Sequence, residues 1–260
     1  MPGVVETGYV DRAQRAICLT CAMRILRGPF LGQSFMLSRQ AKAAFFAVTG
    51  PLMVANGFIY RHFRAPRDGI NRVHLGPGQR NYLGGWINVD ANMFTSRCDL
   101  WADLRNALPF RPNSLDAVYS HHVIEHLPNM EEHLHDVFRC LRPGGLYRVG
   151  GPHGDSAIQK FVQQDSAWFS SFPDNRNSIG GRFENFIFCR REHVTILTRS
   201  YVEELLTLAG FVDLRLCLPV RETHAPQLFA DCLKVEHESD FEVPHTLIIE
   251  ARKPSAARHR

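Results

Sequence analysis

From residue 70 onward, short apolar runs rich in β-branched residues alternate with stretches whose apolar positions recur every three to four residues. The short runs predict strands over 71–75, 86–89, 98–104, 115–119 and 146–149. Between the last two, Leu134, Val137, Phe138 and Leu141 fall at i, i+3, i+4 and i+7, which predicts one apolar helix face. This alternation is typical of a parallel sheet covered by helices.

The same pattern continues toward the carboxyl terminus. Ser200 and Glu203 have the spacing of a capping box, and Gly210 marks the end of the helix that they predict. Two further strands, over 213–218 and 246–251, complete the expected sheet. We therefore expect a single α/β domain in this part of the chain.

The connection between the first two strands is unusually short. Eleven residues, Gly76 to Trp86, join them, which is too few for a full crossover helix. Apolar sheet surface beside this loop would then stay uncovered. Residues 15–65 supply about that much apolar helix, and we expect them to pack there.

Residues 43–60 run eighteen positions without a charge, and basic residues flank them on both sides (Arg39, Lys42; Arg61, Arg64). Gly50-Pro51 and Asn56-Gly57 interrupt the middle of this segment. We expect helices packed on the fold, with a peripheral membrane contact or a membrane span as the alternatives. Acidic residues near the start of the chain argue against a secretory signal, so we expect a cytoplasmic protein, with the inner face of the membrane as an alternative location.

The composition is that of a globular protein, because 45% of the 260 residues are apolar and 22% are charged. We divide the chain into a helical extension over 1–68, a domain over 69–252 with an insertion at about 152–197, and a basic tail over 253–260. The net charge of +4 is too small to indicate nucleic-acid binding. The seven cysteines are expected to be buried thiols. Cys18 and Cys21 lack a second ligand pair, so no metal is expected.

Gly76-Pro-Gly78 after the first strand is a candidate binding loop. A dinucleotide fingerprint would have glycine at Asn81 and an acid about 20 residues after the first glycine, whereas Asp90 follows Gly76 by fourteen. No Lys-Ser or Lys-Thr follows the loop, as a phosphate loop requires. The remaining candidate is a ligand without phosphates, whose ribose hydroxyls would donate hydrogen bonds to the Asp90 carboxylate. An ordinary turn stays the alternative.

An ordered set of motifs covers about residues 71–215: Val73-His-Leu-Gly-Pro-Gly-Gln-Arg80, Gly85-Trp-Ile-Asn-Val-Asp90, Cys98-Asp-Leu-Trp-Ala-Asp-Leu104, Leu108-Pro-Phe110, Leu115-Asp-Ala-Val-Tyr-Ser120, His122-Val-Ile-Glu-His-Leu-Pro128, Leu141-Arg-Pro-Gly-Gly145 and Ala209-Gly-Phe211. The set resembles the class I S-adenosylmethionine-dependent methyltransferases, most closely the small-molecule type 11 group often found with glycan biosynthesis. The resemblance implies a Rossmann-like, seven-stranded sheet of order 3-2-1-4-5-7-6 with the last strand antiparallel, and S-adenosylmethionine as cofactor.

By the same resemblance, each motif position receives a role toward the cofactor. The methionine part would lie against Gly76 and Gly78, and the ribose would be held by Asp90. The adenine would meet Asp103 and Leu104, and the methyl donor would lie beside Ser120 and His121. Two positions depart from the family pattern, His74 in place of an acid and Arg80 in place of a small residue.

The reaction implied is O-methylation of a sugar or another small hydroxylated acceptor. A hydroxyl is a weak acid and profits from a general base, for which histidine is suited. The candidates are His126 with Glu125 as partner, and His122, His153 and His193. His122-x-x-Glu125-His126 also fits an inverted zinc-peptidase motif, which is disfavoured because Pro128 ends the segment.

Two alternatives remain for the function. One is methylation of another small metabolite, a lipid or an amine, and the other is binding of S-adenosylmethionine without catalysis. The acceptor would be bound by the aromatic-rich insertion, whose phenylalanines form either an apolar wall for a sugar or lipid-linked acceptor or a small core of the insertion itself. The sequence leaves the oligomeric state open.

Overall fold

The computed structural model describes residues 39–65, 69–94 and 96–255. Every strand of the described residues lies within Gln40–Arg260. Cys18 and Cys21, most of the expected amino-terminal extension and the end of the basic tail lie outside the described residues.

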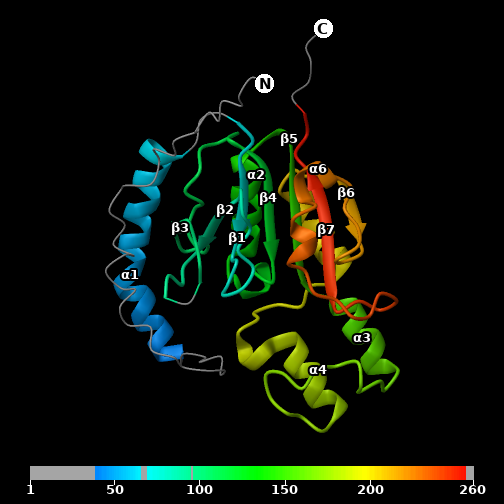
Figure 1. Ribbon diagram of the computed structural model, residues 1–260. Coiled ribbons are helices and arrows are strands. Elements are labelled where there is room, and N and C mark those ends of the chain that lie inside the picture. Colours follow the sequence, from blue (N-terminus) through cyan, green and yellow to red (C-terminus); the bar gives the residue numbers. More distant parts are fainter. Residues whose placement is uncertain (1–38, 66–68, 95, 256–260) are drawn as a thin grey trace, which may run out of the picture. The chain divides into compact units, whose positions relative to one another are not determined.

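Seven strands form one sheet of order β3-β2-β1-β4-β5-β7-β6 (Figure 1). Their bounds are β1 Arg72–Leu75, β2 Ile87–Asp90, β3 Leu100–Trp101, β4 Leu115–His121, β5 Leu141–Pro152, β6 Val212–Cys217 and β7 Thr246–Arg252. The first five pair in parallel, whereas β7 is antiparallel to both β5 and β6. This is the Rossmann-like class I methyltransferase topology that the resemblance implied.

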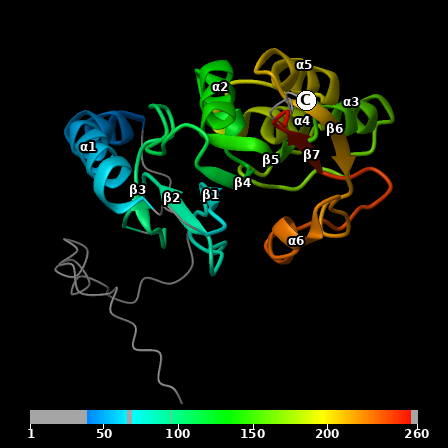
Figure 2. The same cartoon turned by 90° about the horizontal axis from the view of Figure 1, so that it is seen from above.

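Helices cover both faces of the sheet (Figure 2). The α-helices are α1 Arg39–Ile59, α2 Met130–Cys140, α3 Gly154–Val162, α4 Ile179–Phe188, α5 Arg199–Leu208 and α6 Pro226–Phe229, and short turns of helix occur at Tyr60–Arg64, Ile124–His126, Cys189–Arg191 and Cys232–Lys234. The main core lies between the sheet and α2 and α5, where Leu134, Val137 and Leu206 are fully buried. A second cluster packs Trp86, Tyr119 and Phe229 of α6 on the opposite face.

Two predicted strands have different lengths in the structure. β3 is limited to Leu100–Trp101 because the Asp103 carboxylate accepts from the backbone N–H of Arg105, 3.0 Å away, and this turn ends the strand. β5 begins at Leu141, which pairs with Leu115 before a bulge, so the predicted entry loop is itself part of the strand.

The predicted capping box is wrong. Helix α5 begins with Thr198 as its N-cap, and no side chain of the helix makes the cap hydrogen bond. Glu203 instead pairs with Arg199, 2.8 Å apart, and the Arg199 N–H donates to Asp155 at 2.7 Å. The predicted end is confirmed, because Gly210 adopts a left-handed backbone with φ of 101°.

Helix α1 packs one stripe of side chains along the β3 end of the sheet. Met53 is buried, the Asn56 amide donates to the Trp101 carbonyl at 2.9 Å, and the Arg61 guanidinium donates to the Leu108 carbonyl at 2.6 Å. The opposite stripe is apolar and exposed, with Val48 71% and Phe58 61% accessible. Among the described residues, Gln40–Arg64 is the one helical stretch long and apolar enough to cross a membrane.

A buried ion cluster fastens the segment after β6 to the sheet. Arg148 of β5, whose side chain is fully buried, donates to Glu236 at 2.8 Å and to Glu250 of β7 at 2.7 Å. Glu250 also accepts from the Thr223 hydroxyl at 2.6 Å. These bonds fix the 218–238 segment beside the carboxyl ends of β4 and β5.

Cys140, Cys217 and Cys232 are free thiols. Cys140, Cys217 and Cys232 are buried as predicted, and burial raises the pKa of the Cys140 thiol to about 12. Cys98 and Cys189 are half-buried, so the expectation of buried thiols is wrong for these two.

Candidate active site

The glycine loop and Asp90 lie together at the carboxyl ends of β1 and β2. Gly76 and Gly78 both have positive φ, 68° and 57°, and a Cβ at Gly76 would come within 2.5 Å of a Val123 methyl. The Asp90 carboxylate accepts from the Gly78 N–H at 3.1 Å and from the Asn92 N–H at 2.8 Å. Burial raises the pKa of Asp90, although these backbone bonds oppose the rise.

Asp103 has different neighbours from those that the resemblance implied. Arg105 donates to both carboxylate oxygens, from Nε to Oδ1 at 3.0 Å and from Nη2 to Oδ2 at 2.7 Å. The guanidinium also stacks on Phe46 of α1, 3.7 Å from the ring centre. Leu104 is buried in the main core. An adenine amine would therefore compete with Arg105 for the Asp103 carboxylate.

These surroundings fit the nucleoside part of S-adenosylmethionine at the glycine loop. No atom lies within 4 Å of a Cβ placed on Gly78, so the bare backbone there leaves room for a ligand. Asp90 is anchored by backbone amides, and a carboxylate has lone pairs left for ribose hydroxyls.

The predicted methyl-end residues lie at the carboxyl end of β4. The Ser120 hydroxyl and the Tyr147 hydroxyl share a hydrogen bond of 2.7 Å in the core. His121 stacks on Tyr119, and its buried Nε2 has no hydrogen-bond partner. Burial lowers the pKa of His121 well below its usual range, so the ring is neutral at physiological pH.

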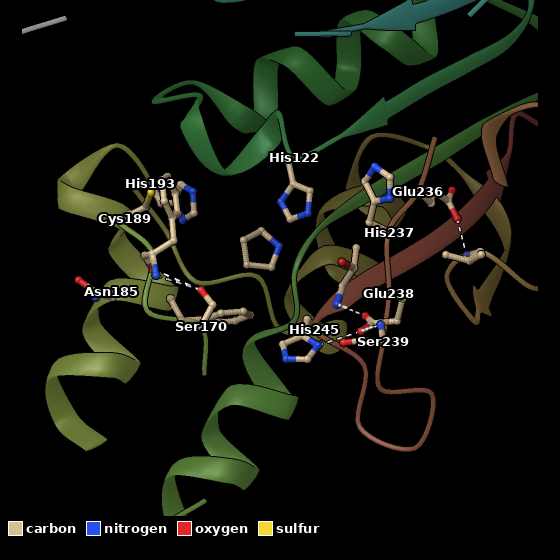
Figure 3. A pocket seen from close by; sticks show the side chains of 15 residues that line it. His122, Ser170, Asn185, Cys189, His193, Glu236, His237, Glu238, Ser239 and His245 are labelled. Atoms are coloured by element: carbon tan, nitrogen blue, oxygen red, sulfur yellow. Dashed lines mark hydrogen bonds and ion pairs between the residues drawn. The ribbon is translucent and has the colours of Figure 1, made fainter. Parts of the chain in front are cut away.

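A cavity of about 720 Å³ opens just beyond these residues (Figure 3). His122 follows β4, Pro152 ends β5, and Thr246 begins β7, so three strand ends meet at its base. The insertion contributes Phe172, Asn185, Phe186 and His193, and the segment after β6 contributes Glu236, His237, Glu238 and Ser239. The predicted insertion therefore does form one wall of a cavity at the carboxyl ends of the central strands.

Glu125 joins three of the predicted histidines to one another. Its side chain is 1% exposed, and Oε1 lies 3.1 Å from His122 Nδ1 and 4.0 Å from His126 Nε2. The His126 and His193 rings are 4.8 Å apart. Burial alone would raise the pKa of Glu125, but the hydrogen bond from His122 and the neighbouring His126 and His193 lower it.

His153, the fourth predicted histidine, has a structural role at the start of α3. Its Nδ1 is the N-cap acceptor for the Ser156 N–H at 3.4 Å. Burial lowers the pKa of His153, with Asp155 opposing the change.

The aromatic residues of the insertion form mainly their own core. Trp168 and Phe169 are buried with Ile187, and Phe161 and Phe183 pack against them. Phe172 and Phe186 in addition line the cavity. The insertion therefore has its own core and also contributes aromatic side chains to a cavity wall, whereas binding of an acceptor there stays a prediction.

One family model, for a methyltransferase domain, matches residues 91–149. The match covers 59 of the 260 residues, and the strand order of the sheet agrees with it. The chain contains a methyltransferase domain. It is an S-adenosylmethionine-dependent enzyme domain by this assignment, which confirms the predicted enzyme class and cofactor.

Solved structures resemble this chain at low sequence identity. A methyltransferase from Thermotoga maritima, described as a possible histamine N-methyltransferase, is 15% identical over 82% of this chain and 95% of that one, with a TM-score of 0.46. Phosphoethanolamine N-methyltransferase 2 of Haemonchus contortus is 14% identical over 83% and 57%, with a TM-score of 0.44. The CurJ carbon methyltransferase is 16% identical over 83% and 55%, with a TM-score of 0.45. The chain spans just over half the length of the last two. No curated protein matches the sequence.

Sequence reasoning missed the wall that follows β6. Glu238 lies in the cavity wall with its side chain fully buried, and it accepts from His245 Nδ1 at 2.8 Å. Burial alone would raise the pKa of Glu238, but the bonds from His245 and from the Asp240, Ser239 and Thr246 N–H groups lower it to about 2. These residues carry no motif, and the spacing of their charges gave no signal for the site.

Proposed function

We propose that this methyltransferase transfers a methyl group to a hydroxyl of a small molecule or glycan, with His122 as the general base. The observation that supports this most is the pairing of His122 with Glu125 at the edge of the cavity. His122 lines the cavity, and its Nδ1 lies 3.1 Å from a carboxylate that is almost wholly buried. The lone pair of Nε2 is then available for a proton.

Glu125 and His122 have separate roles in the proposed transfer. Glu125 accepts the Nδ1–H of His122, which fixes the tautomer and the ring orientation, as carboxylates do in other base dyads. His122 Nε2 takes the proton from the acceptor hydroxyl as its oxygen forms the new bond. S-adenosylmethionine, when bound, supplies an electrophilic methyl group. The glycine loop and Asp90 would hold this cofactor.

The lining of the cavity supports a hydroxylated acceptor. Asn185 is buried, its amide N–H donates to the Asp174 carbonyl, and its Oδ1 has no hydrogen-bond partner. A buried acceptor atom of this kind is satisfied when a ligand hydroxyl donates to it. Phe172 and Phe186 add aromatic surface of the sort that packs against a sugar ring. A cavity of about 720 Å³ is ample for a monosaccharide unit.

The test is transfer of a labelled methyl group from S-adenosylmethionine to a panel of sugars, glycolipids, simple alcohols and amines. We expect label on an oxygen of a hydroxylated acceptor, and a loss of about 10²- to 10⁴-fold in kcat for His122→Gln with unchanged cofactor affinity. His135→Ala, exposed on α2, is the matched control. Label on amine acceptors alone, or full kcat in His122→Gln, would contradict the proposal.

We also propose that the exposed stripe of α1 rests on the cytoplasmic surface of a membrane. The stripe includes Val48, Leu52 and Phe58, each more than half exposed, and the helix is followed by the basic residues Arg61, His62 and Arg64. An exposed apolar stripe next to basic residues suits an interface of anionic lipid. The opposite stripe packs on the sheet through Met53 and Asn56, which favours a surface contact over a span.

Cosedimentation with vesicles tests this placement. We expect binding to phosphatidylglycerol-containing vesicles, and loss of binding when Leu52 and Phe58 are both changed to Glu. Val162→Glu, an exposed apolar position on α3, is the control for added charge. Equal binding of the double variant would contradict the membrane contact.

A further inference from the structure

Glu125, His126 and His193 form a compact group beside the cavity. One ligand atom of each residue lies within 4.8 Å of those of the other two. His126 is adjacent to Glu125 in the chain, whereas His193 comes from the turn that follows α4. His193 lines the cavity and His126 is 41% exposed, so the group is reachable from solvent.

Both histidines are held in the same tautomer by backbone carbonyls. His126 Nδ1 lies 3.0 Å from the Glu192 carbonyl, and His193 Nδ1 lies 2.8 Å from the Ile187 carbonyl. A carbonyl only accepts, so each Nδ1 carries the proton and donates it. Each Nε2 therefore keeps an unprotonated lone pair. Metal-binding histidines are commonly fixed in this way through their second nitrogen.

The carboxylate completes a set of donors suited to a cation. Glu125 Oε1 lies 4.0 Å from His126 Nε2, and the buried Oε2 has no hydrogen-bond partner. Two nitrogen lone pairs and a buried negative charge then lie within a few ångströms of one another. A proton or a cation would relieve their mutual repulsion.

We propose that Glu125, His126 and His193 bind one divalent transition-metal ion of the zinc type. Two imidazoles and one carboxylate are a common donor set for such an ion, with a further position left for water or a substrate oxygen. His122, which donates to Glu125 Oε1, is then a positioning residue for the carboxylate. The bound ion would lie at the edge of the acceptor cavity, because His193 lines it.

The donor atoms lie within 4.8 Å of one another, so metal binding requires them to approach by up to about 1.5 Å. In a tetrahedral zinc site the ligand atoms are about 3.3 Å apart, given bonds of about 2.0–2.2 Å. The separation of 4.0 Å between His126 Nε2 and Glu125 Oε1 closes with a small rotation of the part-exposed His126 ring. This set differs from the inverted zinc-peptidase motif, whose two histidines would be His122 and His126. It also differs from the expectation that no metal is bound.

Metal titration of the tag-free, chelator-treated protein tests the site without any methyl transfer. We expect one Zn²⁺ per chain by calorimetry, and a visible absorption spectrum of tetrahedral Co²⁺ when that ion is used. His126→Ala and His193→Ala should each weaken binding at least about tenfold. His135→Ala should bind as the parent does.

A second pair of variants keeps the test decisive if an alanine variant is unstable. His126→Gln and His193→Gln preserve side-chain volume, and circular dichroism confirms that each is folded. Absence of Zn²⁺ binding up to about 1 mM, which corresponds to about −4.1 kcal/mol, would overturn the proposal. Binding that survives in both histidine variants would do the same. Neither outcome depends on the identity of the methyl acceptor.

Discussion

The polar groups at the glycine loop have hydrogen-bond partners within the protein, whereas some polar groups around the acceptor cavity have none. At the loop, Asp90 accepts from two backbone N–H groups and Asp103 is held by Arg105. Asn185 Oδ1 in the cavity wall and Glu125 Oε2 beside the cavity are buried without a partner. A buried unpaired polar atom costs about 1–3 kcal/mol. The loop is thus complete within its own chain, whereas the cavity has polar atoms that a ligand would satisfy.

The largest effect is expected at Glu125, where the two regions differ most. Glu125→Gln removes the negative charge that orients His122 and that draws His126 and His193 together. We expect kcat to fall about 10²- to 10⁴-fold, and Kd for S-adenosylmethionine to stay within about threefold of the parent value. Single-turnover kinetics and calorimetry measure the two quantities separately.

Glu131→Gln, exposed in the first turn of α2, is the control for loss of a carboxylate. If Glu125→Gln weakened cofactor binding as strongly as it slowed transfer, the two regions would form one coupled site, and the contrast between them would be lost.

The next effect concerns the two glycines of the loop. Gly76→Ala brings a methyl group within 2.5 Å of Val123 in a left-handed backbone, whereas Gly78→Ala meets nothing within 4 Å. We expect Gly76→Ala to lower the free energy of unfolding by about 2–4 kcal/mol and Gly78→Ala by about 1–2 kcal/mol. Urea denaturation measures both.

The two substitutions also report on the ligand. If the cofactor approaches the bare backbone at Gly78, Gly78→Ala should weaken S-adenosylmethionine more than its small effect on stability suggests. Val123→Ala in the Gly76→Ala background should recover part of the lost stability. Equal destabilisation by the two single variants would show that backbone strain, and not the Val123 contact, dominates at the loop.

The sequence predicted the loop side well because its signals are local. Gly76, Gly78 and Asp90 each follow a strand that the apolar pattern predicts, and the carboxyl ends of neighbouring parallel strands meet at one edge of the sheet. The strand order followed from the resemblance and is confirmed. The partner of Asp103 was missed, although Arg105 is only two residues away, because the choice between a ligand and a side chain is not encoded in spacing.

The cavity side could be predicted only in part. The histidine candidates were found by residue type and place, but His193 reaches Glu125 through an insertion whose path the sequence does not specify. His153 has the same residue type and a similar place after a strand, yet it caps α3. The wall after β6 depends on Arg148, Glu236 and Glu250, which pair over about a hundred positions of sequence and show no periodic pattern.

A smaller effect separates the two carboxylates of the loop. Asp90→Asn should weaken S-adenosylmethionine by about 1.5–3 kcal/mol, because its charged oxygens are the acceptors for the ribose. Asp103→Asn should weaken it by less than about 1 kcal/mol, because Arg105 already occupies that carboxylate. Calorimetry on both variants tests the difference. A loss at Asp103 as large as that at Asp90 would restore the direct adenine contact that the resemblance implied.

The smallest effect on kcat is expected at Glu238, a cavity carboxylate that is satisfied like those of the loop. It accepts from His245 and from backbone N–H groups, so Glu238→Gln should cost about 1–2 kcal/mol of stability near pH 5.5 and change kcat little. Burial alone would lower the pKa of His245, but the hydrogen bond to Glu238 outweighs the effect of burial and the pKa is raised.

The stability that this pair contributes should depend on pH in both directions. The pKa of Glu238 is lowered from 4.5 to about 2, so its contribution is complete above pH 4.5 and is lost as pH falls through about 2. The contribution of His245 is complete below 6.5 and is lost as pH rises through its raised pKa. The stability difference between parent and Glu238→Gln should therefore be largest between pH 4.5 and 6.5 and shrink on both sides, as urea denaturation at several pH values would measure. A difference that did not vary with pH would mean that the pair acts by packing alone, and a large loss of kcat would place Glu238 with Glu125 as a group that serves the ligand.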